Sequence, residues 1–311
     1  MKPVLIVNPA SAAGRTGRHF DAIARAVHAA VGEFEARFTR AVGDAVALAR
    51  EAALGGRTLV VAVGGDGTAS EVVDGLLVGG YRRDFGFIPR GSGGDFRRSL
   101  GLPADVKGAA RALAGPATGS IDLGRIELTG PGGAALVRHF VNVASCGVSG
   151  RVAGAVNRSS KLLGGPLAFK LAAARSLLGW RDQRVRWRAD GGPWIEQPVT
   201  ALAVCNGRYF GGGMMVAPGA LLDDGLLDVT IWSGFGLADF VRLQPKLYDG
   251  RHVELPSVRT LRARTVELEP VGDAEVLLEV DGEQPGRLPA RLTVLPGALA
   301  LRGLGPTVRA A

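Results

Sequence analysis

Residues Gly64 to Thr68, with the sequence Gly-Gly-Asp-Gly-Thr, constrain the fold of this chain more than any other segment. They follow a run with strand character, Thr58 to Val63, and precede a helical pattern from Ala69 to Leu77. A glycine-rich turn between a buried strand and a helix N-terminus presents backbone N–H groups, and the helix dipole favours an anion there. Because glycine has no Cβ atom, a phosphate chain can approach the backbone closely. Asp66 adds a carboxylate that can meet the Mg²⁺ accompanying ATP, so the turn predicts a nucleotide site.

The first part of the chain, up to Gly119, alternates strand and helix patterns, which is typical of a parallel sheet wound with helices. Asp44 is predicted to cap one of the helices at its N-terminus, and Gly55-Gly56 to end it. This order predicts a right-handed, doubly wound α/β sheet with its ligand at the carboxyl ends of the strands. Strands are expected at 4–7, 34–38, 58–63 and 85–88, and helices at 20–31, 44–54 and 69–77.

After Gly119, short β-rich runs separated by Gly, Pro and Asp dominate, and their spacing predicts an antiparallel β-sandwich. We therefore expect an α/β domain over 1–119 and a β-sandwich domain over 120–301, with the active site in the cleft between them. The tail 302–311 is a candidate for packing back on the first domain. The expected β runs are 121–128, 139–144, 185–189, 199–205, 227–232, 266–269, 275–281 and 291–295.

One stretch, Lys161 to Arg184, interrupts the β pattern with leucines and aromatic residues among Lys and Arg. From about Leu167 onward it is expected to be helical and basic. A helix packed on the sandwich explains this pattern better than a membrane-facing surface, and both interpretations stay open.

Composition limits the class of protein. The net charge of +8 and the pI near 10.2 favour an acidic partner such as a nucleotide, a nucleic acid or an anionic membrane, although an arginine bias alone would also explain them. No run approaches the roughly 18 apolar residues of a membrane-spanning helix. Cys146 and Cys205 are expected to be reduced core residues, and the scattered histidines argue against a zinc site. The chain opens directly on a strand with no room for a signal peptide, so a cytoplasmic protein is expected.

Four further blocks carry candidate chemistry. Asn8 to Arg15 and Pro89 to Phe96 each follow a predicted strand, and two small-residue loops on adjacent strand ends favour a shared nucleotide pocket. Pro218 to Asp228 is a carboxylate-rich turn, either a surface hairpin or a Mg²⁺ site that uses Asp224. Val280 to Glu283 places two carboxylates at a strand end, where Asp-Gly alone would signal only a hairpin.

These blocks, in this order, resemble the diacylglycerol kinase catalytic-domain family, which includes sphingosine and ceramide kinases and bacterial lipid kinases. The resemblance covers nearly the whole chain. The Gly-Gly-Asp-Gly-Thr turn alone marks a wider superfamily with NAD kinases and phosphofructokinases. The later blocks single out the lipid-kinase branch: Ile121 to Gly124, Phe140 with Asn142 and Gly147, Asn206-Gly207, the turn 218–225, and Asp281-Gly282-Glu283.

The resemblance implies ATP and Mg²⁺ as cofactors. The nucleotide would be bound by Asn8, Thr39, Gly64, Gly65, Asp66, Gly67, Thr68, Ser70, Glu71, Gly91, Ser92 and Asp95. Asp66 would lie near the catalytic Mg²⁺, and Asp224 with the carbonyls of Leu221 and Leu226 would form a structural Mg²⁺ site that Asp122 links to the active centre through water. Glu283 matches the proton acceptor of the bacterial relatives, and Asp281 is its rival for that role.

The sequence departs from the family pattern at a few positions. Ser70 stands where the family usually has Asn, and Ser92-Gly93-Gly94 replaces Thr-x-Asn. Arg90 is charged where an apolar residue is commoner. The acceptor specificity is therefore the part of the function that the resemblance constrains least.

The sequence predicts an ATP-dependent lipid kinase that phosphorylates a hydroxyl of a membrane lipid. Diacylglycerol is the first candidate acceptor, and ceramide or a sphingoid base is the alternative. An NAD kinase and a non-catalytic nucleotide and lipid binder are weaker readings. The expected partner is a lipid at an anionic membrane surface, which makes the protein cytoplasmic and peripherally membrane-associated. No nucleic acid and no stable protein partner are implied, and a homodimer is compatible with the pattern.

Overall fold

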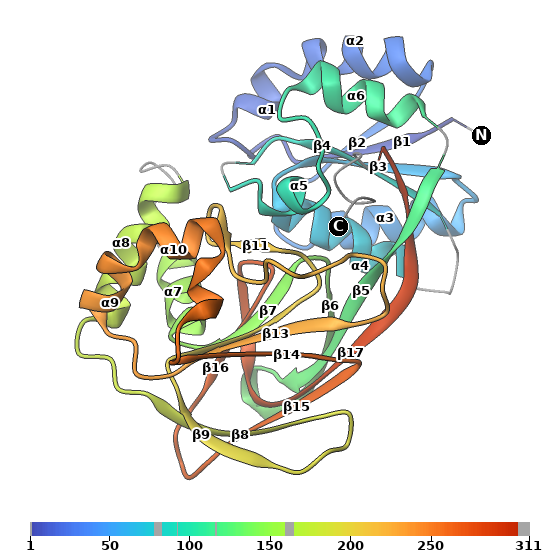
Figure 1. Cartoon of the computed structure of the whole chain (residues 1–311). Coiled ribbons are helices and arrows are strands. Elements are labelled where there is room, and N and C mark those ends of the chain that lie inside the picture. The colour runs from blue at the N-terminus through green and yellow to red at the C-terminus, as the bar shows by residue number, and fades with distance from the viewer. Residues whose placement is uncertain (1, 78–82, 92, 116, 159–164, 304–311) are drawn as a thin grey trace. The chain divides into compact units, whose positions relative to one another are not determined.

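The computed structural model describes residues 2–77, 83–91, 93–115, 117–158 and 165–303 of the chain. They divide into two compact units, one of Met1–Asp122 with Gly297–Ala311 and one of Leu123–Pro296. The first division falls close to the predicted boundary at 119, and the chain returns to the first unit at Gly297, ahead of the predicted tail. Figure 1 shows the first unit mostly in blue and the second in green to orange.

The first unit is built on a parallel sheet of four strands in the order β4-β3-β1-β2. The end of a later strand, β17, adds to the free side of β4 in parallel, with Ala300 opposite Asp84. Strands β1, β3 and β4 are apolar runs that are buried along almost their whole length, as expected for a sheet covered on both faces, whereas the edge strand β2 carries Glu35 and Arg37 and is half-buried to exposed. The four strands are β1 (Val4–Val7), β2 (Glu35–Phe38), β3 (Leu59–Gly64) and β4 (Asp84–Pro89).

Helices cover both faces of this sheet (Figure 1). On one face, Ile23 and Val27 of α2 (Phe20–Val31) and Leu113 of α6 (Val106–Ala114) pack in one core with the strands. The other face carries α3 (Asp44–Leu54) and α4 (Asp66–Leu77). The helix spacing of these apolar residues is what allows each helix to bury one stripe. Two short helices, α1 (Arg15–Arg18) and α5 (Asp95–Ser99), lie in loops that follow β1 and β4.

The second unit is an antiparallel β-structure in which two arms share the strand β17. One arm runs β14-β13-β10-β7-β16-β17, and the other connects β17 to β5 and β6 and, through β15, to β8 and β9. Both arms contribute to one apolar core, which includes Phe140, Trp187 and Leu202. The strands are β5 (Ala117–Thr129), β6 (Ala135–Phe140), β7 (Val143–Gly147), β8 (Gln183–Ala189), β9 (Ile195–Val199), β10 (Ala201–Cys205), β13 (Leu227–Trp232), β14 (Val258–Ala263), β15 (Thr265–Pro270), β16 (Leu277–Val280) and β17 (Glu283–Arg302).

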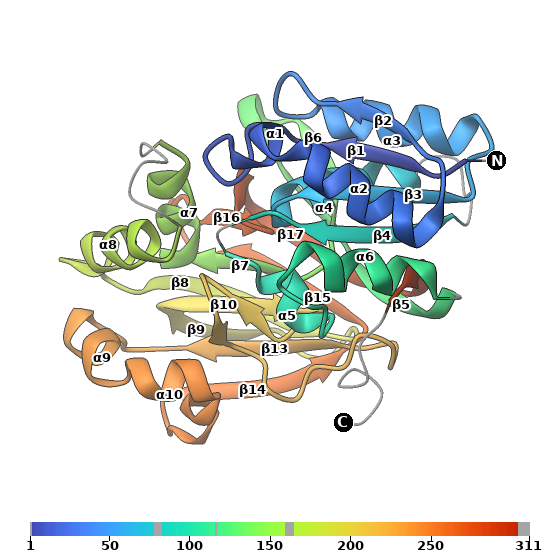
Figure 2. The ribbon, with the colours of Figure 1, turned by 90° about the horizontal axis from the view of Figure 1, so that it is seen from above.

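Four helices gather at one end of the second unit's strands, as both views show (Figures 1 and 2). They are α7 (Val148–Arg158), α8 (Gly165–Leu177), α9 (Leu237–Arg242) and α10 (Gln244–Asp249). The predicted basic helix is therefore present as α8, and it packs against α7 through Val152, Ala172 and Leu177. No helix among the described residues is both long enough and apolar enough to cross a membrane.

Three local predictions were wrong. Asp44 is the first residue of α3 and not its cap, because Gly43 takes the N-cap position and the Asp44 carboxylate accepts hydrogen bonds from the preceding Arg40 and Ala41 amides. The runs 139–144 and 199–205 are each two strands, with breaks at 141–142 and at Thr200. The first break occurs because the backbone amides there bond to a side chain from elsewhere in the chain, as described below.

The two cysteines are buried, free thiols. Cys146 packs in the core between the two arms, whereas Cys205 packs with Met214 and Trp232 in a different cluster. Burial raises the pKa of the Cys146 thiol to about 12 and that of Cys205 well above its ordinary value. Both thiols are therefore protonated at neutral pH and unreactive.

Candidate functional site

In the first unit, the parallel strands bring the predicted nucleotide loops to one edge of the sheet. Asn8 follows β1 and donates its Nδ2 hydrogen to Thr68 Oγ1 at 3.1 Å. Thr39 follows β2, is buried, and donates its amide to the carbonyl of Val7 at 2.9 Å. The turn after β3 and the loop after β4 complete the edge, because β3 and β4 pair in register up to Gly64 and Pro89.

The two glycine loops contact each other through their backbones. The Arg90 amide donates to the carbonyl of Gly64 at 2.6 Å. A Cβ atom on Gly91 would lie 2.7 Å from the Cα of Gly65, so only glycine permits this approach. Gly65, Asp66 and Gly67 stay half-buried, which leaves their backbone within reach of a ligand. Ser92, the predicted hydroxyl of the second loop, lies outside the described residues.

Asp66 joins the two loops. Its Oδ2 atom accepts a hydrogen bond of 2.9 Å from the Asp95 amide at the start of α5. Asp95 is itself held by Arg98, whose Nη1 lies 2.8 Å from the Asp95 carboxylate and 2.6 Å from the carbonyl of Gly93. The structure therefore places Asp66 and Asp95 together, as expected for two members of one site, and adds Arg98, which the sequence did not single out.

Gly94, a departure from the family pattern, has φ 68°, in the left-handed region. Glycine adopts this conformation without strain, and Asn is among the residues that tolerate it best. The substitution of Gly for Asn therefore preserves the backbone of the loop and removes only a side-chain amide.

Glu71 lies on α4 and supports the loop that follows β2. Its carboxylate accepts a hydrogen bond of 3.1 Å from the Gly43 amide. Burial raises the pKa of Glu71, although the amides of Gly43 and Ala45 oppose this shift. Glu71 therefore holds the loop that follows β2, the strand after which Thr39 lies, and its contact with a nucleotide stays a prediction. Ser70 is half-buried on the first turns of α4, and its contact with the nucleotide stays a prediction.

Asp122, which was predicted to connect a metal site with the active centre, accepts a backbone hydrogen bond within the first unit. It is buried, and its Oδ1 atom accepts a hydrogen bond of 2.7 Å from the Gly297 amide. The bond joins the two places where the chain leaves and re-enters the first unit. The role through water stays a prediction.

In the second unit, Asp281 is bonded to the break between β6 and β7. Its Oδ2 accepts a hydrogen bond of 2.8 Å from the Val141 amide, and its Oδ1 accepts bonds of 3.1 and 3.0 Å from the amides of Asn142 and Val143. The residue has φ 47°, so the turn is held in a conformation that few residues other than glycine adopt. Both oxygens of this carboxylate accept hydrogen bonds from backbone amides, so Asp281 fixes the backbone of the break and is a poor candidate for the base that accepts the substrate's proton.

The same break brings together the other motifs that carried the resemblance. The amides of Asn206 and Gly207 both donate to the carbonyl of Asn142 at 2.9 Å, and Asn206 Nδ2 donates to the carbonyl of Val141 at 3.0 Å. Asn142 Nδ2 in turn donates to the carbonyl of Tyr209. Three segments that are far apart in sequence thus form one buried polar network, which fixes the turn at residues 281–283.

Glu283, the predicted base, follows this turn and is exposed. Asn157 of α7 donates from Nδ2 to the Glu283 carboxylate at 3.3 Å. The turn is also held by Glu279, a buried carboxylate that accepts a hydrogen bond of 2.6 Å from the Gly282 amide and another from the hydroxyl of Ser145. Glu279 was missed from sequence, although a charged residue within the apolar run Leu277 to Val280 is a signal that could have found it.

Asp224, the predicted structural Mg²⁺ ligand, already has a cation from the chain. Arg262 forms an ion pair with Asp224 Oδ2, while Asp224 Oδ1 accepts a hydrogen bond of 3.0 Å from the Leu226 amide. Arg262 also lies 3.5 Å from Asp228, its direct partner across β13 and β14. Burial raises the pKa of Asp228 to about 6, an effect that Arg208 partly offsets. A metal ion bound by Asp224, Leu221 and Leu226 would have to displace Arg262.

Among the residues that the structure describes, no three acidic, histidine or cysteine side chains cluster so as to hold a metal ion. A Mg²⁺ that arrives with a nucleotide would need only one or two carboxylates, because it takes its other ligands from phosphate and water. Asp66 and Asp95 are the carboxylates at the glycine loops.

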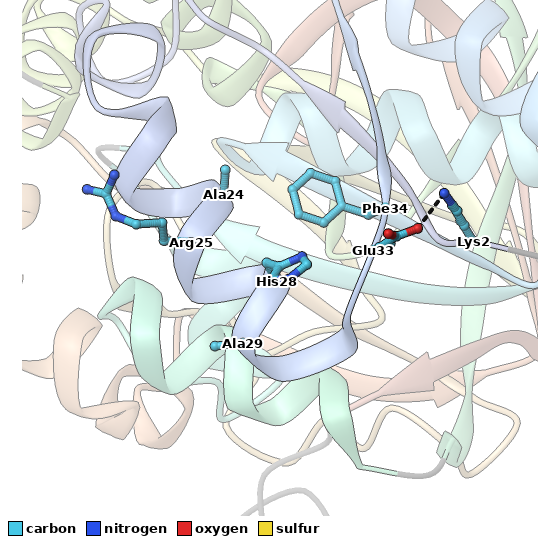
Figure 3. A pocket seen from close by; sticks show the side chains of 7 residues that line it. All are labelled: Lys2, Ala24, Arg25, His28, Ala29, Glu33 and Phe34. Atoms are coloured by element: carbon cyan, nitrogen blue, oxygen red, sulfur yellow. Dashed lines mark ion pairs between the residues drawn. The ribbon is translucent and has the colours of Figure 1, made fainter.

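A pocket of about 480 Å³ lies elsewhere in the first unit (Figure 3). Lys2 precedes β1, and Glu33 and Phe34 precede β2, so the pocket is at the amino ends of the strands and away from the glycine loops. Lys2 and Glu33 form an ion pair in its wall, and both are well exposed. Ligands of doubly wound sheets bind at the opposite edge, so this pocket is not the candidate site.

Comparison with protein families gives two matches that together cover most of the chain. Residues 2–126 match the diacylglycerol kinase catalytic domain. Residues 142–303 match the YegS C-terminal NAD kinase beta sandwich-like domain. The two matches follow the two units closely.

Relatives with similar sequences are diacylglycerol kinases as well. The chain is 32% identical to a diacylglycerol kinase of Mycobacterium tuberculosis, over 96% of this chain and 94% of that protein. It is 30% identical to a diacylglycerol kinase of Bacillus subtilis, over 94% and 92% of the two chains. A crystal structure of a diacylglycerol kinase from Bacillus anthracis has the same fold, with a TM-score of 0.72 at 23% identity over 99% of this chain and 98% of that one.

Proposed function

The chain belongs to the diacylglycerol kinase catalytic-domain family, and from this premise we propose that it is an ATP- and Mg²⁺-dependent lipid kinase. Its reaction transfers the γ-phosphoryl group of ATP to a hydroxyl of a membrane lipid. Diacylglycerol is the acceptor that the names of the relatives favour. Ceramide or a sphingoid base is the alternative, since the described contacts contain no feature that selects among these hydroxyls.

The observation that carries this proposal is the backbone contact between the glycine loops after β3 and β4. Together they offer half-buried glycines, the start of a helix of 12 residues and the carboxylate of Asp66 at one sheet edge. Phosphoryl transfer depends mainly on positioning and charge neutralisation, and Mg²⁺ would supply much of the latter. We assign the phosphates of ATP to Gly64–Thr68 and Gly91, and the Mg²⁺ to Asp66.

We assign Glu283 as the base that accepts the proton of the lipid hydroxyl. Its carboxylate is exposed, whereas both oxygens of its rival Asp281 accept backbone hydrogen bonds. A lipid hydroxyl is a weak nucleophile and benefits from a carboxylate within hydrogen-bond reach. Asp281 then acts as a positioning residue that fixes the turn.

The direct test is transfer of radiolabelled phosphate from ATP to diacylglycerol, ceramide, sphingosine and monoacylglycerol in mixed micelles. We expect at least one lipid to be labelled, and labelling to stop when EDTA removes Mg²⁺. ATP turnover that no lipid of the panel increases would refute the lipid-kinase assignment. Formation of NADP from NAD would instead support the NAD kinase reading.

The variant Asp66→Asn tests the phosphate site. It keeps an oxygen that can accept the Asp95 amide but removes the charge, so the expected result is a loss in kcat of about 100-fold or more with the fold retained. Glu51→Gln is the control, because Glu51 is exposed in the last turn of α3, at the end of the helix that leads into the amino end of β3. Equal activity of the two variants would contradict the role of Asp66.

We further propose that the protein binds anionic membranes peripherally through α8 and α9. Leu171 and Leu178 are 42% and 72% exposed, and Val241 on α9 is 66% exposed. Basic residues, among them Lys170 and Arg175, lie on the same helix as Leu171, and apolar side chains beside cations are typical of membrane-surface segments. Sedimentation with vesicles tests this: binding to phosphatidylglycerol should exceed binding to phosphatidylcholine, and Leu178→Ser should weaken it. Equal binding of wild type and variant would contradict the assignment.

A further inference from the structure

We propose that Asn157 is a positioning residue for Glu283, an inference that rests on the proposed role of Glu283 as the base. The Nδ2 atom of Asn157 lies 3.3 Å from Glu283 Oε2 and 3.3 Å from the carbonyl oxygen of Gly282. One amide group therefore reaches both the backbone of the turn and the carboxylate that the turn carries. Asn157 belongs to no motif that the sequence pointed to.

The helix that carries Asn157 is fixed against the hairpin of β16 and β17. At Gly150, a Cβ atom would lie 2.5 Å from the carbonyl oxygen of Leu277, and at Gly154 it would lie 2.7 Å from the side-chain amide of Gln284. Gln284 Nε2 donates to the carbonyl of Gly150 at 2.8 Å. The clash at position 150 is with backbone, so only glycine there allows α7 to lie this close to the hairpin, whereas at position 154 the Gln284 side chain would have to shift.

The spacing of residues along α7 places Asn157 on the helix face that packs against the hairpin of β16 and β17. Positions 150, 154 and 157 follow each other by four and three residues, so they share one face of the helix. Gly150 and Gly154 lie where this face of α7 contacts the hairpin, and Asn157, at the end of the same face, contacts the turn at Gly282. Asn157 is therefore placed by the packing of the whole helix and not by a flexible loop.

The backbone of the turn is already fixed from its other side. The Asp281 carboxylate accepts hydrogen bonds from the amides of 141–143, and the Gly282 amide donates to buried Glu279 at 2.6 Å. The side chain of Glu283 is exposed and has several rotatable bonds, so its position depends on its side-chain contacts, of which the one to Asn157 is described above. A neutral amide donor can restrict this side chain and stabilise its ionised form without placing a full positive charge beside a base.

The predicted consequence is kinetic. A base that must lie within hydrogen-bond reach of a hydroxyl loses rate when its side chain is free to rotate away. We expect Asn157→Ala to lower kcat by about tenfold, while KM for ATP stays within about twofold, because the ATP loops belong to the other unit. Asn157→Asp places a like charge beside Glu283, so the acid limb of the kcat profile should move up by about one pH unit.

The experiment compares full-length wild type, Asn157→Ala, Asn157→Asp and Glu283→Ala, with Arg158→Ala as the matched control. Arg158 is exposed and is the neighbour of Asn157 on α7. For each protein, kcat and KM are measured from pH 5 to 9 with the lipid that the wild type phosphorylates best, together with the thermal unfolding temperature. Arg158→Ala should behave as wild type, which shows that a surface change on this helix is harmless.

The outcomes separate the inference from the function on which it rests. If Glu283→Ala is inactive while Asn157→Ala has the kcat of wild type, the positioning role is wrong and the kinase assignment stands. Loss of kcat in Asn157→Ala together with an equal loss of ATP binding and of thermal stability also overturns it, because a structural role explains that result. If no lipid is phosphorylated, the proposed function fails, and NMR titration of Glu283 becomes the test: a pKa that is the same in wild type and Asn157→Asp overturns the contact.

Discussion

Replacement of Asp281 should cost stability as well as activity, because the residue satisfies three backbone amides. Val141 and Val143 are 1% exposed and Asn142 is 6% exposed, so water reaches their amides poorly. The hydrogen bonds to Asp281 are 2.8, 3.1 and 3.0 Å long. A buried amide that loses its acceptor costs about 1–3 kcal/mol.

For Asp281→Ala we therefore expect the free energy of unfolding to fall by about 4 kcal/mol. This value lies in the lower half of the range for three amides, because Asp281 is only half-buried and its removal lets some water in. A loss of this size is a large fraction of the roughly 5–15 kcal/mol that stabilises a typical domain.

Asp281→Asn refines the test. Its remaining oxygen can still accept the amides of Asn142 and Val143, while its amide group would face the Val141 N–H without bonding to it. We expect a loss of about 2 kcal/mol, roughly half that of the alanine variant.

Urea denaturation followed by circular dichroism measures both losses, with Asp223→Ala as a control at an exposed aspartate of the second unit. The control should stay within about 0.5 kcal/mol of wild type. A change below about 1 kcal/mol for Asp281→Ala would refute the reasoning, since the three amides would then have another acceptor. If Asp281→Asn is as stable as wild type but inactive, Asp281 and not Glu283 would be the candidate base.

Two further predictions concern the carboxylates near Arg262. The pKa of Asp228 in the folded state is about 6, above its ordinary value of 3.8, so the folded state favours the protonated carboxyl. The contribution of this protonated form to the free energy of unfolding is therefore fully present below about pH 4 and is lost as the pH rises to 6. Relative to wild type, Asp228→Asn should therefore gain up to about 3 kcal/mol in urea denaturation between pH 4 and pH 7, and a constant difference would contradict the burial of the charge. Because Arg262 pairs with Asp224, the unfolding temperature of wild type should differ by less than about 1 °C between EDTA and Mg²⁺. The variant Arg262→Leu should be less stable than wild type in EDTA and should regain stability when Mg²⁺ is added. A strong Mg²⁺ effect on wild type would show that the metal displaces the arginine.

The sequence determined the first unit almost completely, because its structure follows from local periodicity. Apolar runs predicted β1, β3 and β4, an alternating pattern predicted β2, and helical spacing predicted the long helices up to residue 77, with bounds close to those observed. The addition of β17 to β4 was not predicted. The contact of the glycine loops also followed from topology, since parallel strands place their carboxyl ends at one edge. The wrong N-cap at Asp44 shows the limit of this logic: the same carboxylate can accept amides from before the helix instead of within it.

The second unit was harder to predict, because its polar network is built from long-range contacts. The break at 141–142 depends on Asp281, which follows it by more than a hundred residues, so no local pattern could reveal it. The helix α7 was missed because Gly150 and Gly154 have low helix propensity, yet Gly150 is needed for its close packing on the backbone of the hairpin. Contacts of this kind override propensity, and for this reason Asn157 emerged only from the structure.

The path of β17 has a consequence for how the protein is synthesised. This strand begins in the second unit and ends in the first, where Ala300 and Leu301 pair with β4. The ribosome therefore completes the whole second unit before the first unit receives this strand, and until then one edge of β4 has unpaired backbone groups. Exposed strand edges are templates for aggregation. The first unit is thus a discontinuous domain whose edge depends, during translation, on a segment made more than two hundred residues after the rest of its sheet.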